Sequence, residues 1–287
     1  MNIVGIIAEY NPFHNGHLYQ IKMIKEMYKD SLLVVILNGN FTQRGEASII
    51  DKWDKTKIIL DHNVDLVVEL PLFYGINNAN IFAYGSLKIL HELKIDTLVF
   101  GSECNDITTL RDIANIKINN KEYNSILKDE LDKGISFPMA SSNAINSLMN
   151  KVIDSPNDIL GISYIEEILK NKYCINPICI KRTNDYHSNN INEVSSASAI
   201  RNAIKNNMDY KKAVPTNVIK YIKEPIFIED YYDLLKYKIL SSKDLTIYHG
   251  IEEGIENRIN KFILKCNTLE ELIQSIKTKR YTYNRIK

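Results

Sequence analysis

The first hundred residues alternate short apolar runs with stretches of helical length, and this pattern constrains the fold more than any other feature. Each short run, such as residues 32–37, is almost continuous in Val, Ile and Leu. Strands of this kind are buried on both faces, as in a parallel sheet that is covered by helices on both sides. The pattern therefore predicts βαβ units and an α/β fold.

Five strands are expected, at residues 2–8, 32–37, 65–69, 97–100 and 173–180. Helices are expected at residues 17–29, 51–62, 80–93 and 195–205. Residues 107–170 have helical periodicity throughout, with interruptions at 136–138 and 155–157, which predicts a helical insertion before the last strand. Beyond Pro215 only helical segments are expected, including 230–240 and 269–277.

The length and the charge distribution indicate two regions. The chain has 287 residues and is 45% hydrophobic, which is enough for about two domains with sizeable cores. The net charge is only +1, but residues 1–202 carry 20 basic and 24 acidic side chains, whereas residues 203–287 carry 16 and 11. We expect a catalytic, sheet-containing region at 1–207 and a helical, basic region at 208–287 that is better suited to a polyanion.

The ends and the cysteines exclude several protein classes. The apolar run at residues 3–8 is short and leads directly into Glu9, so it is neither a signal peptide nor a membrane span. The four cysteines are scattered and form no Cys-x-x-Cys pair. We therefore expect a cytoplasmic protein without disulfides, structural zinc or a membrane partner.

The sharpest motif is Asn11-Pro12-Phe13-His14-Asn15-Gly16-His17, which follows the first expected strand and opens the first expected helix. In an open α/β sheet, ligands bind at the carboxyl ends of the strands, and a helix N-terminus there favours phosphate. Two histidines on one helical face can donate hydrogen bonds to a phosphoryl group as charge develops on it. A lone histidine would indicate a helix cap or a metal ligand, but the whole string matches the His-x-Gly-His signature of nucleotidyltransferases.

A second motif, Ser195-Ser196-Ala197-Ser198-Ala199-Ile200-Arg201, resembles the Ser/Thr-x-Ile-Arg element of adenylyltransferases. Ser198 at a helix start and Arg201 one turn later can hold the β- and γ-phosphates of ATP. Taken alone, these residues are also compatible with an ordinary N-cap and a solvated arginine. A Walker A loop and a Gly-x-Gly-x-x-Gly fingerprint are both absent, so another cradle must hold the phosphates.

Several strings along the chain together resemble the bacterial tRNA(Met) cytidine acetate ligases. They are Ile7 to His17, Gly39-Asn40-Phe41-Thr42-Gln43-Arg44-Gly45-Glu46, Asp65 to Pro71, Phe100-Gly101-Ser102-Glu103, Pro156 to Gly161, Ile180-Lys181-Arg182 and Lys277 to Thr282. The resemblance implies a Rossmann-like nucleotidyltransferase with a helical insertion and an all-helical C-terminal region. It also implies an enzyme that activates acetate with ATP and acetylates the exocyclic amine of the wobble cytidine in elongator tRNA(Met). Acetyl-CoA is then not needed, and DNA is not expected as a partner. Mg²⁺ is the default counterion of ATP.

The motifs and the resemblance together define the candidate site. The expected catalytic residues are His14, His17 and Arg201. The expected ATP-binding residues are Ile7, Ala8, Glu9, Tyr10, Asn11, Pro12, Phe13, His14, Asn15, Gly16, His17, Leu18, Tyr19, Gln20, Gly101, Asn157, Arg182, Ser198 and Arg201.

The C-terminal segment and two other functions complete the expectations. Residues 277–287 contain five basic side chains, no acid and the tyrosines Tyr281 and Tyr283, which suits either RNA or an exposed basic helix end. Members of the ligase family usually continue past this string with further helices. A small-molecule adenylyltransferase would use the two motifs alone. A non-catalytic RNA-binding protein would keep only a relic of the nucleotide pocket.

Overall fold

The computed structural model describes residues 2–182 and 195–287, which form two compact units. The first unit comprises Met1–Gln43 and Ser48–Pro225, and the second comprises Arg44–Ala47 and Ile226–Lys287. The first unit extends beyond residue 207, because the segment after α9 (Ala197–Lys205) packs back onto it. In that segment Lys212 accepts a hydrogen bond from Asn15 Nδ2 (2.8 Å), and Asn217 contacts His62. The functional division at 207 stays a prediction.

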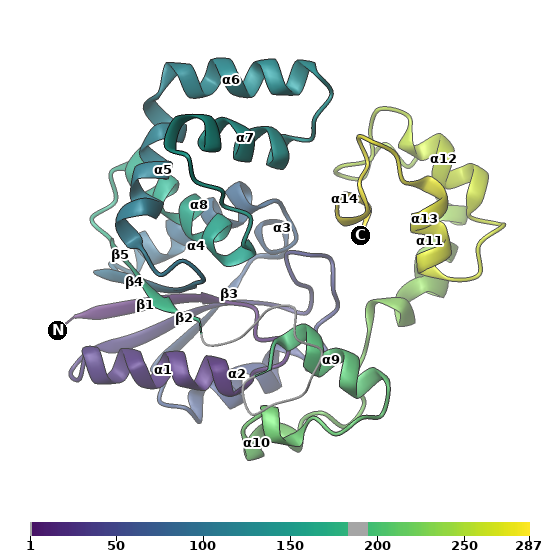
Figure 1. The fold of residues 1–287 in the computed structure, drawn as a ribbon. Coiled ribbons are helices and arrows are strands. Elements are labelled where there is room, and N and C mark those ends of the chain that lie inside the picture. Colours follow the sequence, from purple (N-terminus) through teal and green to yellow (C-terminus); the bar gives the residue numbers. More distant parts are fainter. Residues whose placement is uncertain (1, 183–194) are drawn as a thin grey trace. The chain divides into compact units, whose positions relative to one another are not determined.

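The core of the first unit is a parallel sheet, as the apolar runs predict (Figure 1). Its five strands have the order β3-β2-β1-β4-β5, and all neighbouring pairs are parallel. They are β1 (Ile3–Ala8), β2 (Leu32–Asn38), β3 (Leu66–Leu70), β4 (Thr97–Ser102) and β5 (Asn176–Lys181). All five predicted strands are thus confirmed, but β5 begins later than expected. The reason is that Lys172 turns left-handed and the Tyr173 N–H bonds back to Ile168, which ends the preceding helix there.

Helices cover both faces of this sheet (Figure 1). One face carries α1 (Asn15–Met27) and α2 (Lys52–Leu60), and the other carries α4 (Ala79–Glu92), α5 (Ile107–Asn119) and α8 (Pro156–Asn171). Gly5 lets α4 approach β1, because a Cβ atom there would lie 2.8 Å from Leu90 Cδ2. Burial of β1, β2 and β4 between these layers follows from their unbroken apolar composition.

The predicted helical insertion is confirmed between β4 and β5. Besides α5 and α8 it contains α6 (Lys121–Asp132) and α7 (Phe137–Met149), which form an outer pair in Figure 1. Pro138 and Pro156 occupy the first turns of α7 and α8, where the missing N–H is tolerated. The remaining elements of the first unit are α3 (Leu72–Gly75), α9 (Ala197–Lys205), a 3₁₀ turn at Lys211–Ala213 and α10 (Thr216–Ile219).

The second unit is helical in its described residues and has its own apolar core. Its elements are a 3₁₀ turn at Ile228–Tyr231, α11 (Tyr232–Ser241), α12 (Ile255–Phe262), α13 (Leu269–Ile276) and α14 (Tyr283–Ile286). α12 lies in the region beyond Pro215 where only helical segments are expected, and its buried side chains Ile255 and Ile259 stand one helical turn apart. Tyr281 is buried in this core, and its hydroxyl donates to the Glu252 carbonyl (2.7 Å). Tyr281 is therefore not available for base stacking, contrary to one of the two interpretations of the C-terminal segment.

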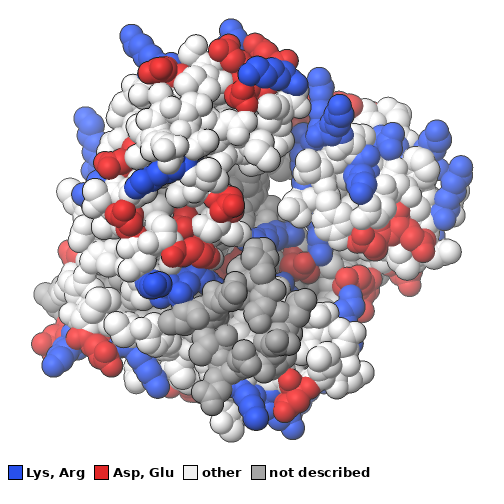
Figure 2. All heavy atoms as spheres, viewed as in Figure 1, with Lys and Arg blue, Asp and Glu red and all other residues white. Residues whose placement is uncertain are grey.

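Charges of both signs share the surface. On the face drawn in Figure 2, Lys and Arg side chains alternate with Asp and Glu side chains, in keeping with a net charge of +1. Within residues 2–182 and 195–287, no helix is both long enough and apolar enough to cross a bilayer.

Candidate active site

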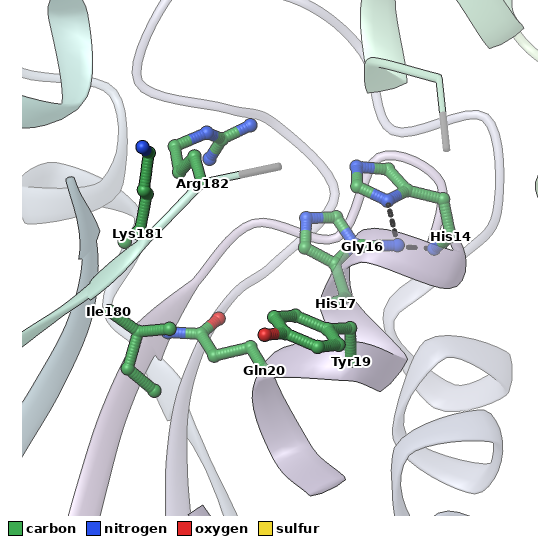
Figure 3. A pocket seen from close by; sticks show the side chains of 9 residues that line it. His14, Gly16, His17, Tyr19, Gln20, Ile180, Lys181 and Arg182 are labelled. Carbon is green, nitrogen blue, oxygen red and sulfur yellow. Dashed lines mark hydrogen bonds between the residues drawn. The ribbon is translucent and has the colours of Figure 1, made fainter. Parts of the chain in front are cut away.

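The turn between β1 and α1 shapes the candidate site (Figure 3). His14 is the N-cap of α1, and its ring Nδ1 accepts a hydrogen bond from the Gly16 N–H (3.1 Å). His17 lies three residues later, and its Nδ1 accepts from the His14 N–H (3.2 Å). This reciprocal arrangement is a capping box built from two imidazoles. The rings stack with centroids 3.6 Å apart, so the motif spacing does bring the two histidines together.

The hydrogen bonds of the two rings determine their protonation. Since each Nδ1 accepts a backbone N–H, the proton of each neutral ring lies on Nε2. Burial, followed by the charge of Arg182, lowers the pKa of His14 to about 3. Burial, followed by His14 and Arg182, also lowers the pKa of His17 well below its usual value. Both residues are thus neutral near pH 7 and offer Nε2–H groups as hydrogen-bond donors.

Aromatic side chains pack against the histidine pair. The Tyr10 ring lies 4.6 Å from the His17 ring and 5.0 Å from the Phe13 ring, centroid to centroid. Phe13 stacks in turn on His62. Tyr10 has a φ of 48°, a left-handed conformation that is unfavourable for a bulky side chain and is typical of residues at functional turns. The surrounding packing therefore maintains a strained turn next to the two histidines.

The pocket beside the histidines combines residues from distant parts of the chain. Arg182 and Lys181, at the end of β5, lie across from the histidine pair in Figure 3. The complete lining is His14, Gly16, His17, Tyr19, Gln20, Gly101, Ile180, Lys181 and Arg182. Gly101 makes room for the arginine, because a Cβ atom there would lie 3.1 Å from Arg182 Cγ. The pocket is at the carboxyl ends of β1, β4 and β5, where an open α/β sheet binds ligands.

The Arg182 guanidinium is held by two other side chains. Its Nη1 donates to Asn157 Oδ1 (3.3 Å), and its Nε lies 3.7 Å from Glu103 Oε1. Asn157 Nδ2 also donates to Glu103 Oε1. Glu103 Oε2 is buried and accepts no hydrogen bond in the described part of the chain. The predicted ATP residues Gly101, Asn157 and Arg182 thus lie together, and Glu103 connects two of them.

A buried aspartate fixes the loop that carries Glu103. Asp158 is 1% exposed and accepts hydrogen bonds from the backbone N–H groups of Glu103 and Cys104, both at 3.1 Å. It also accepts from the hydroxyls of Ser102 and Ser155. Asp158 belongs to a string shared with the ligase family, but the sequence by itself predicts no role for it. No local pattern indicates this role, because the two N–H groups lie 55 and 54 residues away along the chain.

Ser198 and Arg201 lie near this turn but not in the lining of the pocket. Ser196 is the N-cap of α9, and Ser198 follows in the first turn with its hydroxyl 3.0 Å from that of Ser196. Arg201 Nη1 donates to the Asn11 carbonyl (2.7 Å), so α9 contacts the turn after β1. The phosphate contacts expected of these two residues stay a prediction. The lining residues Ile180 and Lys181 were quoted only as part of a family string.

A larger cavity of about 340 Å³ lies between α4, α5, α7 and α8. Its walls are mainly apolar, with Ile113, Ile145 and Phe137 among them, and Lys117 is its one titratable lining residue. Lys117 is paired with Glu166. This cavity lacks the convergent polar groups of the histidine pocket, so we place the chemistry at the histidines.

The fold and the histidine turn define the class of protein. A parallel sheet with a His-x-Gly-His turn after its first strand is the arrangement of a nucleotidyltransferase. In agreement, the HIGH Nucleotidyl Transferase family matches residues 1–287. The chain is therefore a nucleotidyltransferase of this type, as the motif predicts.

Relatives narrow the assignment further. A tRNA(Met) cytidine acetate ligase of Mycoplasma mobile is 41% identical over 99% of this chain and 95% of its own length. The Clostridium acetobutylicum enzyme of the same name is 40% identical over 100% of this chain and 77% of its own length. Thermotoga maritima TmcAL bound with alpha-thio ATP has a TM-score of 0.89 at 33% identity, covering 100% of this chain and 73% of that one. The chain belongs to the tRNA(Met) cytidine acetate ligase family.

Proposed function

We propose that this protein uses ATP to join acetate to the exocyclic amine of the wobble cytidine of elongator tRNA(Met). Family membership favours this ligase over a small-molecule adenylyltransferase or a non-catalytic RNA-binding protein. The observation that carries the chemical part is the pair of neutral histidines at the N-terminus of α1, with Arg182 opposite. We place the reaction in the cytoplasm, where its tRNA substrate is found.

The first step is the activation of acetate. An acetate oxygen attacks the α-phosphorus of ATP, a new P–O bond forms, and the bond to pyrophosphate breaks with its electron pair on the leaving oxygen. Negative charge grows on the phosphoryl oxygens. The Nε2–H groups of His14 and His17 and the Arg182 guanidinium are donors held in place before the reaction, and such donors stabilise that charge without reorganisation.

The nucleotide contacts follow from the same pocket. The positive end of the α1 dipole at this turn suits the phosphates. The nucleotide is contacted from the side of β4 and β5 by Gly101, Asn157 and Arg182. The β- and γ-phosphates are assigned to Ser198 and Arg201. Within residues 2–182 and 195–287, no three His, Cys, Asp or Glu side chains form a metal site. We assign Mg²⁺ to the triphosphate, which it enters as part of the substrate.

The second step passes the acetyl group to RNA. The cytidine amine attacks the acetyl carbonyl, a C–N bond forms, and AMP leaves as the C–O bond breaks. A base inside a structured anticodon loop is stacked, so the cytidine has to be splayed out to reach the acetyl-adenylate. The polar segment at residues 39–43 of the first unit, which follows β2 at the same edge of the sheet, is assigned to this substrate.

The experiment is mass spectrometry of nucleosides from elongator tRNA(Met) incubated with the protein, MgATP and isotopically labelled acetate. We expect label in cytidine, and its loss in His17→Ala. The matched control is His91→Ala, because His91 lies in the last turn of α4, where it stacks on Tyr173. Unlabelled cytidine with the unaltered protein, while acetyl-adenylate forms in the same tube, would limit the function to the activation of acetate.

A further inference from the structure

A second polar cluster lies at the carboxyl ends of β1 and β2, apart from the histidine pocket. Its centre is Lys55 of α2, whose side chain is completely buried. Lys55 Nζ donates to three carbonyl oxygens, those of Glu9 (3.0 Å), Asn38 (2.8 Å) and Gly39 (2.8 Å). An ammonium group has three donors, so all of its hydrogen-bonding capacity is used. Lys55 thus ties the end of β1 to the end of β2 and fixes the backbone of Glu9.

The Glu9 carboxylate is held by one oxygen and open at the other. Its Oε1 accepts hydrogen bonds from Asn38 Nδ2 (3.2 Å) and from the Gln43 N–H (2.6 Å). Its Oε2 accepts no hydrogen bond from the described residues. This oxygen is also not one of their buried polar atoms, so it is accessible. A carboxylate oxygen that is oriented in this way and accessible is prepared to accept a hydrogen bond from a ligand.

Glu9 lies at the middle of the edge of the sheet that is formed by the carboxyl ends of the strands. β1 is the central strand, with β4 and β5 on one side and β2 and β3 on the other. The nucleotide pocket uses the first side, through Gly101 and Arg182. Glu9 follows β1 directly and bonds to Asn38, at the end of β2 on the second side. A group that attacks the acetyl-adenylate has to come from outside the nucleotide pocket, and Glu9 stands at that boundary.

Other candidate bases at this edge are already engaged. His14 and His17 carry their ring protons on Nε2 and are donors there. Glu69, at the end of β3, forms an ion pair with Lys52 (2.7 Å). Glu103 Oε1 is bonded to Asn157 and lies near Arg182, and Asp51 caps α2. Glu103 Oε2 also accepts no hydrogen bond from the described residues, but it is buried. Glu9 Oε2 is therefore the acceptor among these groups that is both unpartnered and not buried.

We propose that Glu9 binds the exocyclic amine of the substrate cytidine and accepts its proton during acetyl transfer. This proposal rests on the proposed function. A carboxylate is the usual acceptor for the N4 amino group of cytosine. As the amine nitrogen bonds to the acetyl carbon and AMP leaves with the electron pair of the broken C–O bond, one N4 proton moves to Glu9 Oε2 and then to solvent. Glu9 thereby both recognises the amine and assists its attack.

The test uses Glu9→Gln in the full chain and follows the two steps separately. The glutamine Oε1 keeps the hydrogen bonds from Asn38 and Gln43, but an NH₂ group replaces the free oxygen and opposes the N4 donor. Because Glu9 also lies in the segment expected to bind ATP, we expect acetate-dependent ATP–pyrophosphate exchange to fall as well, but by no more than about tenfold. Single-turnover transfer of labelled acetyl from acetyl-adenylate to tRNA should fall about 100-fold or more. Glu9→Asp, which keeps a carboxylate, should recover part of that loss.

The matched control is Glu69→Gln, which changes a carboxylate at the same edge that is already paired with Lys52. It should leave both steps near their original rates. A parallel loss of exchange and transfer in Glu9→Gln would overturn the proposal and place Glu9 in nucleotide binding, and unchanged transfer would overturn it as well. Failure of the unaltered protein to acetylate tRNA would instead refute the proposed function, so the two failures are distinguishable.

Discussion

The two compact units differ in whether polar side chains are buried inside them. In the first unit, charged and polar side chains such as His14, Lys55 and Asp158 lie in the interior at the carboxyl edge of the sheet. In the second unit, the apolar cluster contains only aliphatic, tyrosine and cysteine side chains, and all buried polar or charged residues of the described chain lie between Asn11 and Ser196. Burying polar groups costs free energy unless each is hydrogen-bonded. In the first unit, His14, Lys55 and Asp158 lie at the edge of the sheet that carries the candidate site.

The largest expected effect concerns Arg182 of the histidine pocket. Arg182→Met removes a charged donor held by Asn157 and Glu103, so kcat/KM for ATP in acetate-dependent pyrophosphate exchange should fall by about 100-fold to 1,000-fold. The matched control is Arg258→Met in the second unit, where the guanidinium donates hydrogen bonds to the end of α13. Equal losses in the two variants would erase the contrast between the units.

Removal of the buried lysine should show how much the first unit depends on its internal polar groups. Lys55→Met leaves three carbonyl oxygens without their donor, and we expect a loss of about 3 kcal/mol in the free energy of unfolding. Denaturant titration of the full chain measures it. Lys25→Met is the control, since it breaks an exposed ion pair with Asp65 and should cost about 1 kcal/mol or less.

Acidification should weaken the first unit before the second. In the folded state the pKa of His14 is about 3, against an ordinary value of 6.5, and that of His17 is also lowered. Between pH 3 and 6.5 the unfolded chain binds more protons than the folded chain. The contribution of the neutral histidines to the free energy of unfolding is therefore complete above about pH 6.5 and is lost as the pH falls toward 3. The slope is at most about 1.4 kcal/mol per pH unit and histidine.

Hydrogen exchange read segment by segment, from pH 7.5 down to 4.5, measures this acid effect in the intact protein. The second unit should change little over that range, because its apolar cluster contains no histidine. In His14→Asn, which retains a good N-cap, the part of the pH dependence that comes from His14 should disappear. Equal acid sensitivity in the two units would contradict the assignment of this effect to the buried histidines.

The smallest expected effect is in the second unit. Arg258 Nε and Nη2 donate to the carbonyls of Ile276 (3.0 Å) and Ser275 (2.9 Å), which close the C-terminal end of α13. Arg258→Met should lower the protection of α13 against hydrogen exchange by about 1 kcal/mol while pyrophosphate exchange persists. A loss of several kcal/mol would mean that this unit also depends on an internal polar anchor.

Much of the site could be predicted because its elements are local. The motif from Asn11 to His17 lies within one turn, so the sequence places both histidines at a helix start and brings their rings together. Arg182, Asn157 and Gly101 were included through family resemblance, since no local pattern connects them. The Glu103 link could not be predicted, because 54 residues separate it from Asn157.

The amino-acid sequence by itself determined the five strands, their burial and the place of the histidine motif, because hydrophobic periodicity and chain connectivity act over short distances. Tertiary structure alone decided the protonation of the histidines, the orientation of Arg182 and the complete burial of Lys55. Each of these depends on the low polarity and the exact partners at one edge of the sheet. Such surroundings exist only after distant segments have packed together, and local patterns do not encode which segments will meet.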